Sequence, residues 1–132
     1  MTTVHIGDDL NPIAFYALGL QLEDERYLTG DGPIRKRVIS KVFPALHLEY
    51  VAVDKAYQGQ DVGTDIMVRV IEVFRRSVLE FGLPVLTLVP LNEKLVAFYA
   101  SVGFVRYAER LGQRRMMMPA RTALELPERA GV

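Results

Sequence analysis

Cysteine is absent from the 132 residues of this chain. Its absence excludes disulfide bonds, thiolate metal sites and a cysteine nucleophile. A net charge of one sign is also absent, because 16 Lys and Arg residues balance 16 Asp and Glu residues, whereas proteins that bind nucleic acids through their whole surface are usually basic. No apolar run approaches the roughly 20 residues that cross a bilayer, and the first residues do not resemble a signal peptide. We therefore expect a cytoplasmic protein with no membrane contact.

The length and the hydropathy pattern predict one domain. A chain of 132 residues is long enough to bury one hydrophobic core. No linker, internal repeat or low-complexity tract divides it. We expect a single domain over residues 1–118 and a C-terminal tail over residues 119–132, where two prolines occur and no clear period is present.

A strand-helix-strand unit occupies the middle of the chain. Leu46–Val53 is a near-continuous apolar run that predicts a buried strand, and Pro84–Val89 predicts a second one. Between them, Thr64–Phe81 repeats apolar residues at helical spacing. Two neighbouring strands joined through a helix run parallel. The flanking elements expected are a hairpin of Thr3–Ile6 with Ile13–Leu22, a helix between the cap Asn92 and Gly103, and a hairpin of Phe104–Tyr107 with Gln113–Met118.

A glycine-bearing loop joins the first of these strands to the helix. Its sequence is Tyr57-Gln58-Gly59-Gln60-Asp61-Val62-Gly63-Thr64. Ligands of open α/β sheets bind where strands end, and the first turn of a helix offers unpaired N–H groups to an anion. The loop therefore predicts a binding site for a diphosphate that needs no metal. The alternative is that the glycines are there only for the geometry of the turn, as in many such loops. The loop is not a P-loop, because no Lys follows Gly63, and its glycine spacing is not that of a dinucleotide fingerprint.

Two segments resemble the GNAT superfamily of acetyltransferases. The strand that ends in Val53-Asp54, followed by the loop from Gln58 to Thr64, is similar to that family's acetyl-CoA-binding motif. Downstream, Asn92 and the segment Ala97–Phe104 resemble the family's second motif, Asn followed by Phe-Tyr-x-x-x-Gly-Phe. The resemblance covers about residues 46–118 and implies an α/β (α+β) fold, a GNAT-like mixed central sheet with a βαβ cofactor-binding unit. The first motif also resembles the branch of toxins that acetylate aminoacyl-tRNA.

The resemblance implies a role for each matching position. Acetyl-CoA would be the co-substrate, with no metal. Tyr99 would be the general acid that protonates the departing thiolate, a reasonable task for a phenol of pKa about 10. Otherwise Tyr99 is a core aromatic with its hydroxyl at the edge. The cofactor-binding residues implied are Val51, Val53, Gln58, Gly59, Asp61, Val62, Gly63, Thr64 and Asn92.

The general base has two candidates, His47 and Glu49. They lie two residues apart on one predicted strand, so their side chains share a face. Related acetyltransferases place a glutamate at the position that matches His47, and a histidine titrates near neutral pH. The structural alternatives are a satisfied polar residue for His47 and a solvated or ion-paired residue for Glu49.

Two departures from the family pattern carry expectations of their own. Asp61 stands where the motif has glycine, and a carboxylate about 6 Å from a phosphate costs about 0.7–3 kcal/mol. The helices that normally precede the first hairpin are missing, which should expose an apolar patch and favour a homodimer or indicate a partial chain.

The sequence therefore predicts an N-acetyltransferase that moves an acetyl group from acetyl-CoA to a primary amine by direct attack. The acceptor is a small molecule or a macromolecule. Contact with tRNA through Arg35–Arg37 and Arg114-Arg115 is weakly indicated. The alternatives are a non-catalytic acyl-CoA-binding or regulatory module on the same fold, and an interaction domain in which the glycine loop is only a turn.

Overall fold

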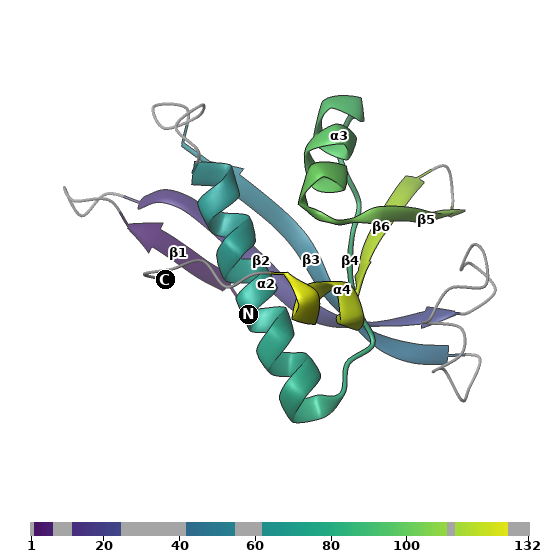
Figure 1. Ribbon diagram of the computed structural model, residues 1–132. Coiled ribbons are helices and arrows are strands. Elements are labelled where there is room, and N and C mark those ends of the chain that lie inside the picture. Colours follow the sequence, from purple (N-terminus) through teal and green to yellow (C-terminus); the bar gives the residue numbers. More distant parts are fainter. Residues whose placement is uncertain (1, 7–11, 25–41, 55–61, 111–112, 127–132) are drawn as a thin grey trace.

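The computed structural model describes residues 2–6, 12–24, 42–54, 62–110 and 113–126. Strands and helices alternate along most of this part of the chain (Figure 1). The elements are β1 (Thr2–Ile6), β2 (Pro12–Asp24), β3 (Val42–Val53), α2 (Val62–Phe81), β4 (Val85–Leu88), α3 (Glu93–Val102), β5 (Val105–Arg110), β6 (Gln113–Pro119) and α4 (Ala120–Glu125).

One mixed sheet contains the six strands in the order β1-β2-β3-β4-β6-β5. The pair β3–β4 is parallel, and α2 connects its two strands. Every other neighbouring pair is antiparallel. The expected strand-helix-strand unit, both expected hairpins and the mixed α/β sheet are therefore confirmed.

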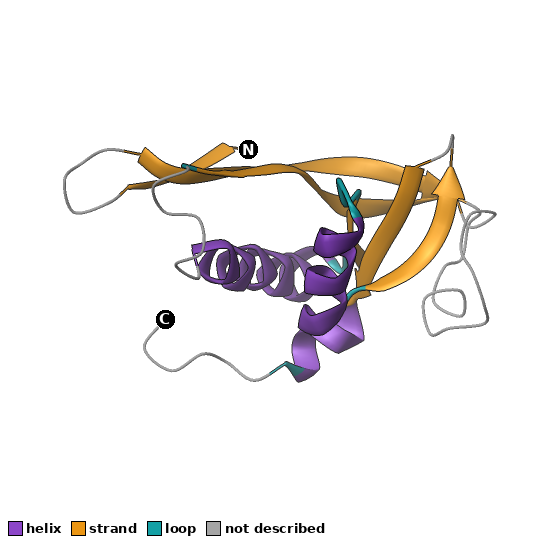
Figure 2. Cartoon of the chain, turned by 90° about the horizontal axis from the view of Figure 1, so that it is seen from above, coloured by secondary structure: helices purple, strands orange, loops and turns teal. Residues whose placement is uncertain are grey.

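The three helices of the described residues lie on one side of the sheet (Figure 2), and all of them follow β3 in the chain. The apolar stripe of α2 is buried there, with Val70 and Phe74 both 0% exposed. It packs on what we call the helix-covered face of the sheet, whose buried side chains include Leu18, Leu48, Leu86, Met116 and Met118. Since successive strand residues point to opposite sides, the second face carries Gln21, Glu23, His47, Thr87 and Arg115.

Both ends of α3 are capped by the residues that the sequence predicts. The Asn92 side chain accepts a hydrogen bond from the Leu95 N–H at 2.9 Å and so caps α3. Gly103 ends α3 with a φ of 124°, a conformation that favours glycine. The buried Phe104 closes this end through a ring contact with Tyr99.

The segment after Pro119 differs from the expected tail. Ala120–Glu125 form α4, which packs against α2 and buries Ala120 and Ala123. Small side chains allow this close approach, and the Arg75 guanidinium donates to the Leu126 carbonyl at 3.3 Å. The expectation of a tail is wrong for these residues, while the domain limits themselves stay a prediction.

Candidate active site

A cleft forms where the two parallel strands part. β3 pairs with β4 only over Leu46–Leu48, but β3 continues to Val53. The remaining edge of β3 borders a cleft of about 100 Å³. The cleft is lined by Leu48, Glu49, Tyr50, Val51, Leu88, Val89, Leu91, Leu95 and Tyr99. Three sequence-predicted site residues, Glu49, Val51 and Tyr99, thus come together from β3 and α3.

Tyr99 belongs to α3 and lines this cleft with a partly buried side chain. Its ring lies edge-on to Phe98 and Phe104, with centroids 5.4 and 5.7 Å away. Burial raises the pKa of the Tyr99 phenol above its ordinary value, because the ionised form loses solvation. The phenol therefore keeps its proton at neutral pH and can donate it to a developing anion.

The first turn of α2 includes Val62, Gly63 and Thr64. Val62 is buried, whereas Thr64 is exposed. A Cβ added at Gly63 would meet no heavy atom within 4 Å, so a ligand can approach this backbone closely. The predicted loop residues Gln58, Gly59 and Asp61 lie outside the described residues.

Val51 and Val53 are half-buried residues of β3, in its stretch beyond the last pair with β4. Asn92 is exposed and uses its side-chain oxygen as the helix cap, which leaves its amide NH₂ to meet a ligand.

His47 and Glu49 share the second face of the sheet, but their surroundings differ. His47 Nδ1 lies 2.8 Å from Thr87 Oγ1. Burial, then the positive charge of Arg115, lower the pKa of His47, against the opposing effects of Glu23 and Glu49. Glu49 is exposed and lines the cleft, and its carboxylate lies over Gly19, where an added Cβ would be 2.7 Å from Oε1.

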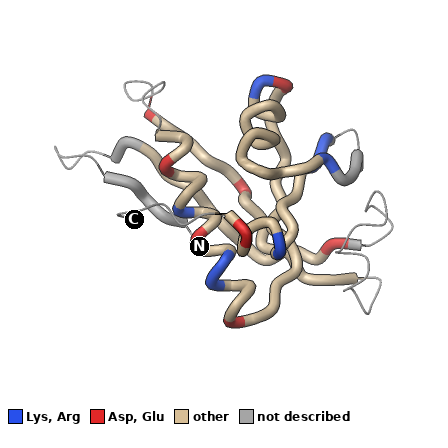
Figure 3. Tube along the Cα trace, viewed as in Figure 1, with Lys and Arg blue, Asp and Glu red and all other residues tan. Residues whose placement is uncertain are grey.

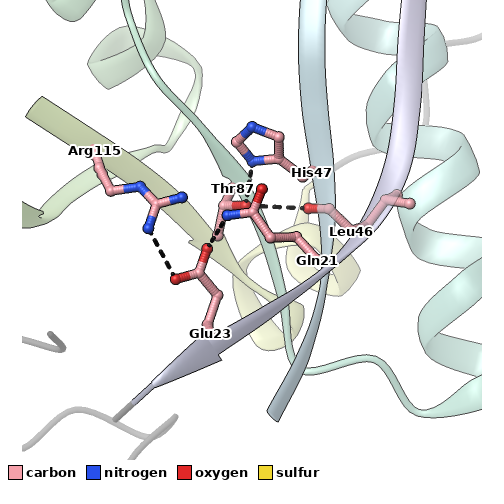
Figure 4. Close-up of polar contacts among 6 residues, drawn as sticks. All are labelled: Gln21, Glu23, Leu46, His47, Thr87 and Arg115. Atoms are coloured by element: carbon pink, nitrogen blue, oxygen red, sulfur yellow. Dashed lines mark hydrogen bonds and ion pairs between the residues drawn. The ribbon is translucent and has the colours of Figure 1, made fainter. Parts of the chain in front are cut away.

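A buried polar cluster surrounds His47 (Figure 4). Glu23 is 1% exposed and accepts hydrogen bonds from Arg115 at 3.1 Å and from Gln21 at 2.8 Å. Thr87 also donates to the Leu46 carbonyl at 3.5 Å. Sequence reasoning did not find Glu23 or Thr87 as site residues. One feature of the sequence could have indicated Thr87: it is the only polar residue of β4, whose other residues, Val85, Leu86 and Leu88, are apolar.

Among the described residues, basic and acidic side chains are intermixed rather than gathered by sign (Figure 3). Arg114 forms an ion pair with Glu93, which also pairs with Arg106 at 3.0 Å. Arg115 is 6% exposed and paired with Glu23. The expectation that Arg115 contacts tRNA phosphates is therefore wrong, because its guanidinium is buried. The basic run Arg35–Arg37 lies outside the described residues.

Two further properties concern metals and membranes. In the part of the chain that the structure describes, no group of three or more His, Asp and Glu side chains could hold a metal ion. No helix within the described ranges is long and apolar enough to cross a membrane.

The site is thus a cleft beside the only parallel strand pair of the described sheet, lined by Tyr99 and by the end of β3. The chain belongs to the acetyltransferase (GNAT) domain family, which matches residues 11–106. This membership confirms the predicted family and the predicted class, an acetyl-CoA-dependent N-acetyltransferase.

Solved structures agree with this fold. A tyrosine-to-phenylalanine mutant of KacT superimposes with a TM-score of 0.78 at 24% identity, covering 92% of this chain and 71% of that one. AtaT complexed with acetyl-methionyl-tRNAfMet gives 0.77 at 22%, covering 88% and 67%. AtaTR bound with acetyl-CoA gives 0.71 at 21%, covering 92% and 69%. A comparison with curated protein sequences gives no match.

Proposed function

We propose that this acetyltransferase acetylates the α-amino group of an aminoacyl-tRNA, with Tyr99 as general acid. The observation that carries the proposal is the cleft between the diverging ends of β3 and β4, which brings Tyr99 to the open edge of β3. The choice of acceptor is supported by the structural similarity to AtaT, which was solved with acetyl-methionyl-tRNAfMet. A cytoplasmic location is part of this proposal, because that is where charged tRNA is found.

Acetyl-CoA fits the residues that border the cleft. The stretch of β3 beyond its last pair with β4, which includes Val51 and Val53, would run alongside the pantetheine arm as an added strand would. The Val51 N–H would polarise the acetyl carbonyl. The first turn of α2 would receive the pyrophosphate, helped by Gly63, whose missing side chain leaves the backbone open. Asn92 would use its free amide NH₂ near the same ligand.

The reaction needs one proton removed and one supplied. The amine nitrogen attacks the acetyl carbonyl carbon, the carbon–sulfur bond breaks, and an amide forms. The amine loses its proton to His47, or to Glu49 through water, and Tyr99 gives its proton to the thiolate. Because thiols have pKa values near 8.5 and phenols near 10, the difference in acidity opposes this last transfer, and the site favours it by holding the phenol close to the departing sulfur.

Self-association is proposed as well. Leu20 and Leu22 are 74% and 70% exposed on β2 and share one side of that strand. Exposed apolar patches of this kind mark interaction surfaces, and a second copy of the chain is the occupant we propose. Light scattering after gel filtration should give twice the mass of one chain. The Leu20→Lys variant should give the mass of a single chain.

Two measurements on the purified protein test the function. Acetyl-CoA at 100 times its dissociation constant should add about 2.7 kcal/mol of stability, read as a higher melting temperature. Thiol release should then require charged tRNA, with uncharged tRNA and free amino acids as controls. Tyr99→Phe should lower kcat by about 100-fold or more while the acetyl-CoA shift is retained.

The matched control is Tyr16→Phe, because Tyr16 is a buried core residue outside the cleft. It should keep full turnover. Turnover that survives Tyr99→Phe would remove Tyr99 as the acid. A melting shift without thiol release from any charged tRNA or amine would instead indicate a non-catalytic acyl-CoA-binding module.

A further inference from the structure

His47 and Thr87 are register partners across the parallel pair β3–β4. Their side chains meet on the second face, one pair before the strands part at Leu48 and Leu88. Thr87 is 1% exposed, and burying a hydroxyl without a partner costs about 1–3 kcal/mol. A valine at position 87 would fill nearly the same space without the cost of burying a hydroxyl. The contribution of the Thr87 hydroxyl therefore lies in its hydrogen bonds.

The Thr87 hydroxyl has one proton to donate. Its oxygen is 3.5 Å from the Leu46 carbonyl and 2.8 Å from His47 Nδ1. The carbonyl only accepts, so a hydroxyl that donates to it must accept at the other contact. With the hydroxyl donating to the carbonyl, the donor at the 2.8 Å contact is His47 Nδ1–H, and the tautomer is the part of the inference that the experiment below tests. A neutral ring with its proton on Nδ1 has its lone pair on Nε2, and Figure 4 shows that nitrogen pointing away from Thr87.

Charged groups from three strands face this ring. Arg115 on β6 and Glu23 on β2 form the buried ion pair, and Glu49 lies two residues along β3. Burial and Arg115 act to lower the pKa of His47, while the two carboxylates oppose them. The net effect favours the neutral imidazole, the form that can take up a proton.

We propose that Thr87 is a positioning residue, which holds His47 with Nδ1 protonated so that Nε2 can accept the proton of the attacking amine. Thr87 itself touches neither substrate. The inference rests on the proposed function, because it gives His47 the role of base. It also goes beyond that function, since it assigns the tautomer and its cause.

The tautomer can be measured without any acceptor. The chain has two histidines, His5 and His47, so ring ¹⁵N spectra contain two sets of signals, which the His5→Asn variant assigns. In the wild-type protein at neutral pH, His47 should carry its proton on Nδ1. In Thr87→Val the proton should move towards Nε2, the site usually preferred by free imidazole side chains, and Thr87→Ser should restore the wild-type pattern. A proton on Nε2 in the wild type would overturn the proposal.

Kinetics then connect the tautomer to catalysis. Thr87→Val should lower kcat about 10- to 100-fold, up to the lower end of the roughly 100- to 10,000-fold that a general base contributes, and leave the KM for acetyl-CoA unchanged. Thr87→Ser should recover most of the rate, which loss of packing alone would not explain. Full turnover in Thr87→Val with a changed tautomer would overturn the catalytic part.

The two proposals fail differently. If His47→Asn keeps wild-type turnover while Tyr99→Phe is inactive, the acetyl transfer stands and the inference on Thr87 is wrong. If the wild type acetylates no amine, the proposed function is wrong and the role of Thr87 in catalysis falls with it.

Discussion

The two faces of the sheet differ in what their buried side chains do. The helix-covered face is apolar and packs on α2, with Leu86, Met118 and Phe74 all 0% exposed. The second face holds a buried ion pair, a buried hydroxyl and a half-buried histidine side by side (Figure 4). Apolar burial stabilises the fold without directional demands, whereas each buried polar group must be matched by a partner. We therefore expect the first face to account for most of the stability, and we propose that the second contributes to the chemistry next to the cleft.

Phe74→Ala is the strongest test of the helix-covered face. The side chain is fully buried at the centre of α2, so its loss leaves a cavity and should cost about 3–5 kcal/mol. Urea unfolding should show an earlier midpoint. Variants still folded at low temperature should keep the wild-type dissociation constant for acetyl-CoA. A cost below about 1 kcal/mol would contradict the assignment of this face as the stabilising one.

Glu23→Ala tests whether the second face also contributes stability. Removing one member of a buried ion pair leaves the other charge uncompensated, at a cost of about 3 kcal/mol. Arg115 would be that charge, since its side chain is 8% exposed and that of Glu23 is 1%. The double variant Glu23→Leu with Arg115→Met should be clearly more stable than Glu23→Ala in the same urea titration. Equal stabilities would show that the pair is not desolvated as the geometry implies.

Local sequence patterns predicted most of the first face and little of the second. The apolar spacing in α2 and the caps Asn92 and Gly103 are local signals, so these elements were predicted close to their observed bounds. The start of β3 at Val42 was missed because Pro44 interrupts the apolar run. Proline is tolerated there because β4 first pairs with β3 at Leu46, which leaves that side free of the ladder.

The polar cluster could not be predicted, because it depends on register between distant strands. Thr87 pairs with His47 on one side and with Met117 on the other, which places Arg115 two residues along β6 on the same face. The short helix α4 was missed for a related reason. A helix of six residues is too short to show a helical period in the sequence. The packing of Ala120 and Ala123 stabilises α4 instead.

Gly19→Ala should move the Glu49 carboxylate on the second face without disturbing the fold, and so separates chemistry from stability on that face. The new methyl would meet Glu49 Oε1 at 2.7 Å, and the exposed Glu49 side chain can swing into water. Stability should change by no more than about 0.5 kcal/mol, while kcat/KM for the acceptor should fall about 3- to 10-fold, or about 0.7–1.4 kcal/mol. If Glu49 is the reason, Glu49→Gln should show a similar loss, and the double variant should lose no more than either one.

The pKa of His47 tests how the neighbouring charges of the second face act on this ring, and the expected effect is the smallest of these predictions. Burial and then Arg115 lower its pKa from the ordinary 6.5, so its ring signals should titrate with a midpoint below pH 6.5. The sign for stability follows: the folded state disfavours the imidazolium, so the contribution of His47 is present above pH 6.5 and is lost as the pH falls towards the lower folded value. Glu49→Gln removes a charge that favours the imidazolium, so the midpoint should fall further. An upward shift would mean that Glu49 acts on His47 through something other than its charge.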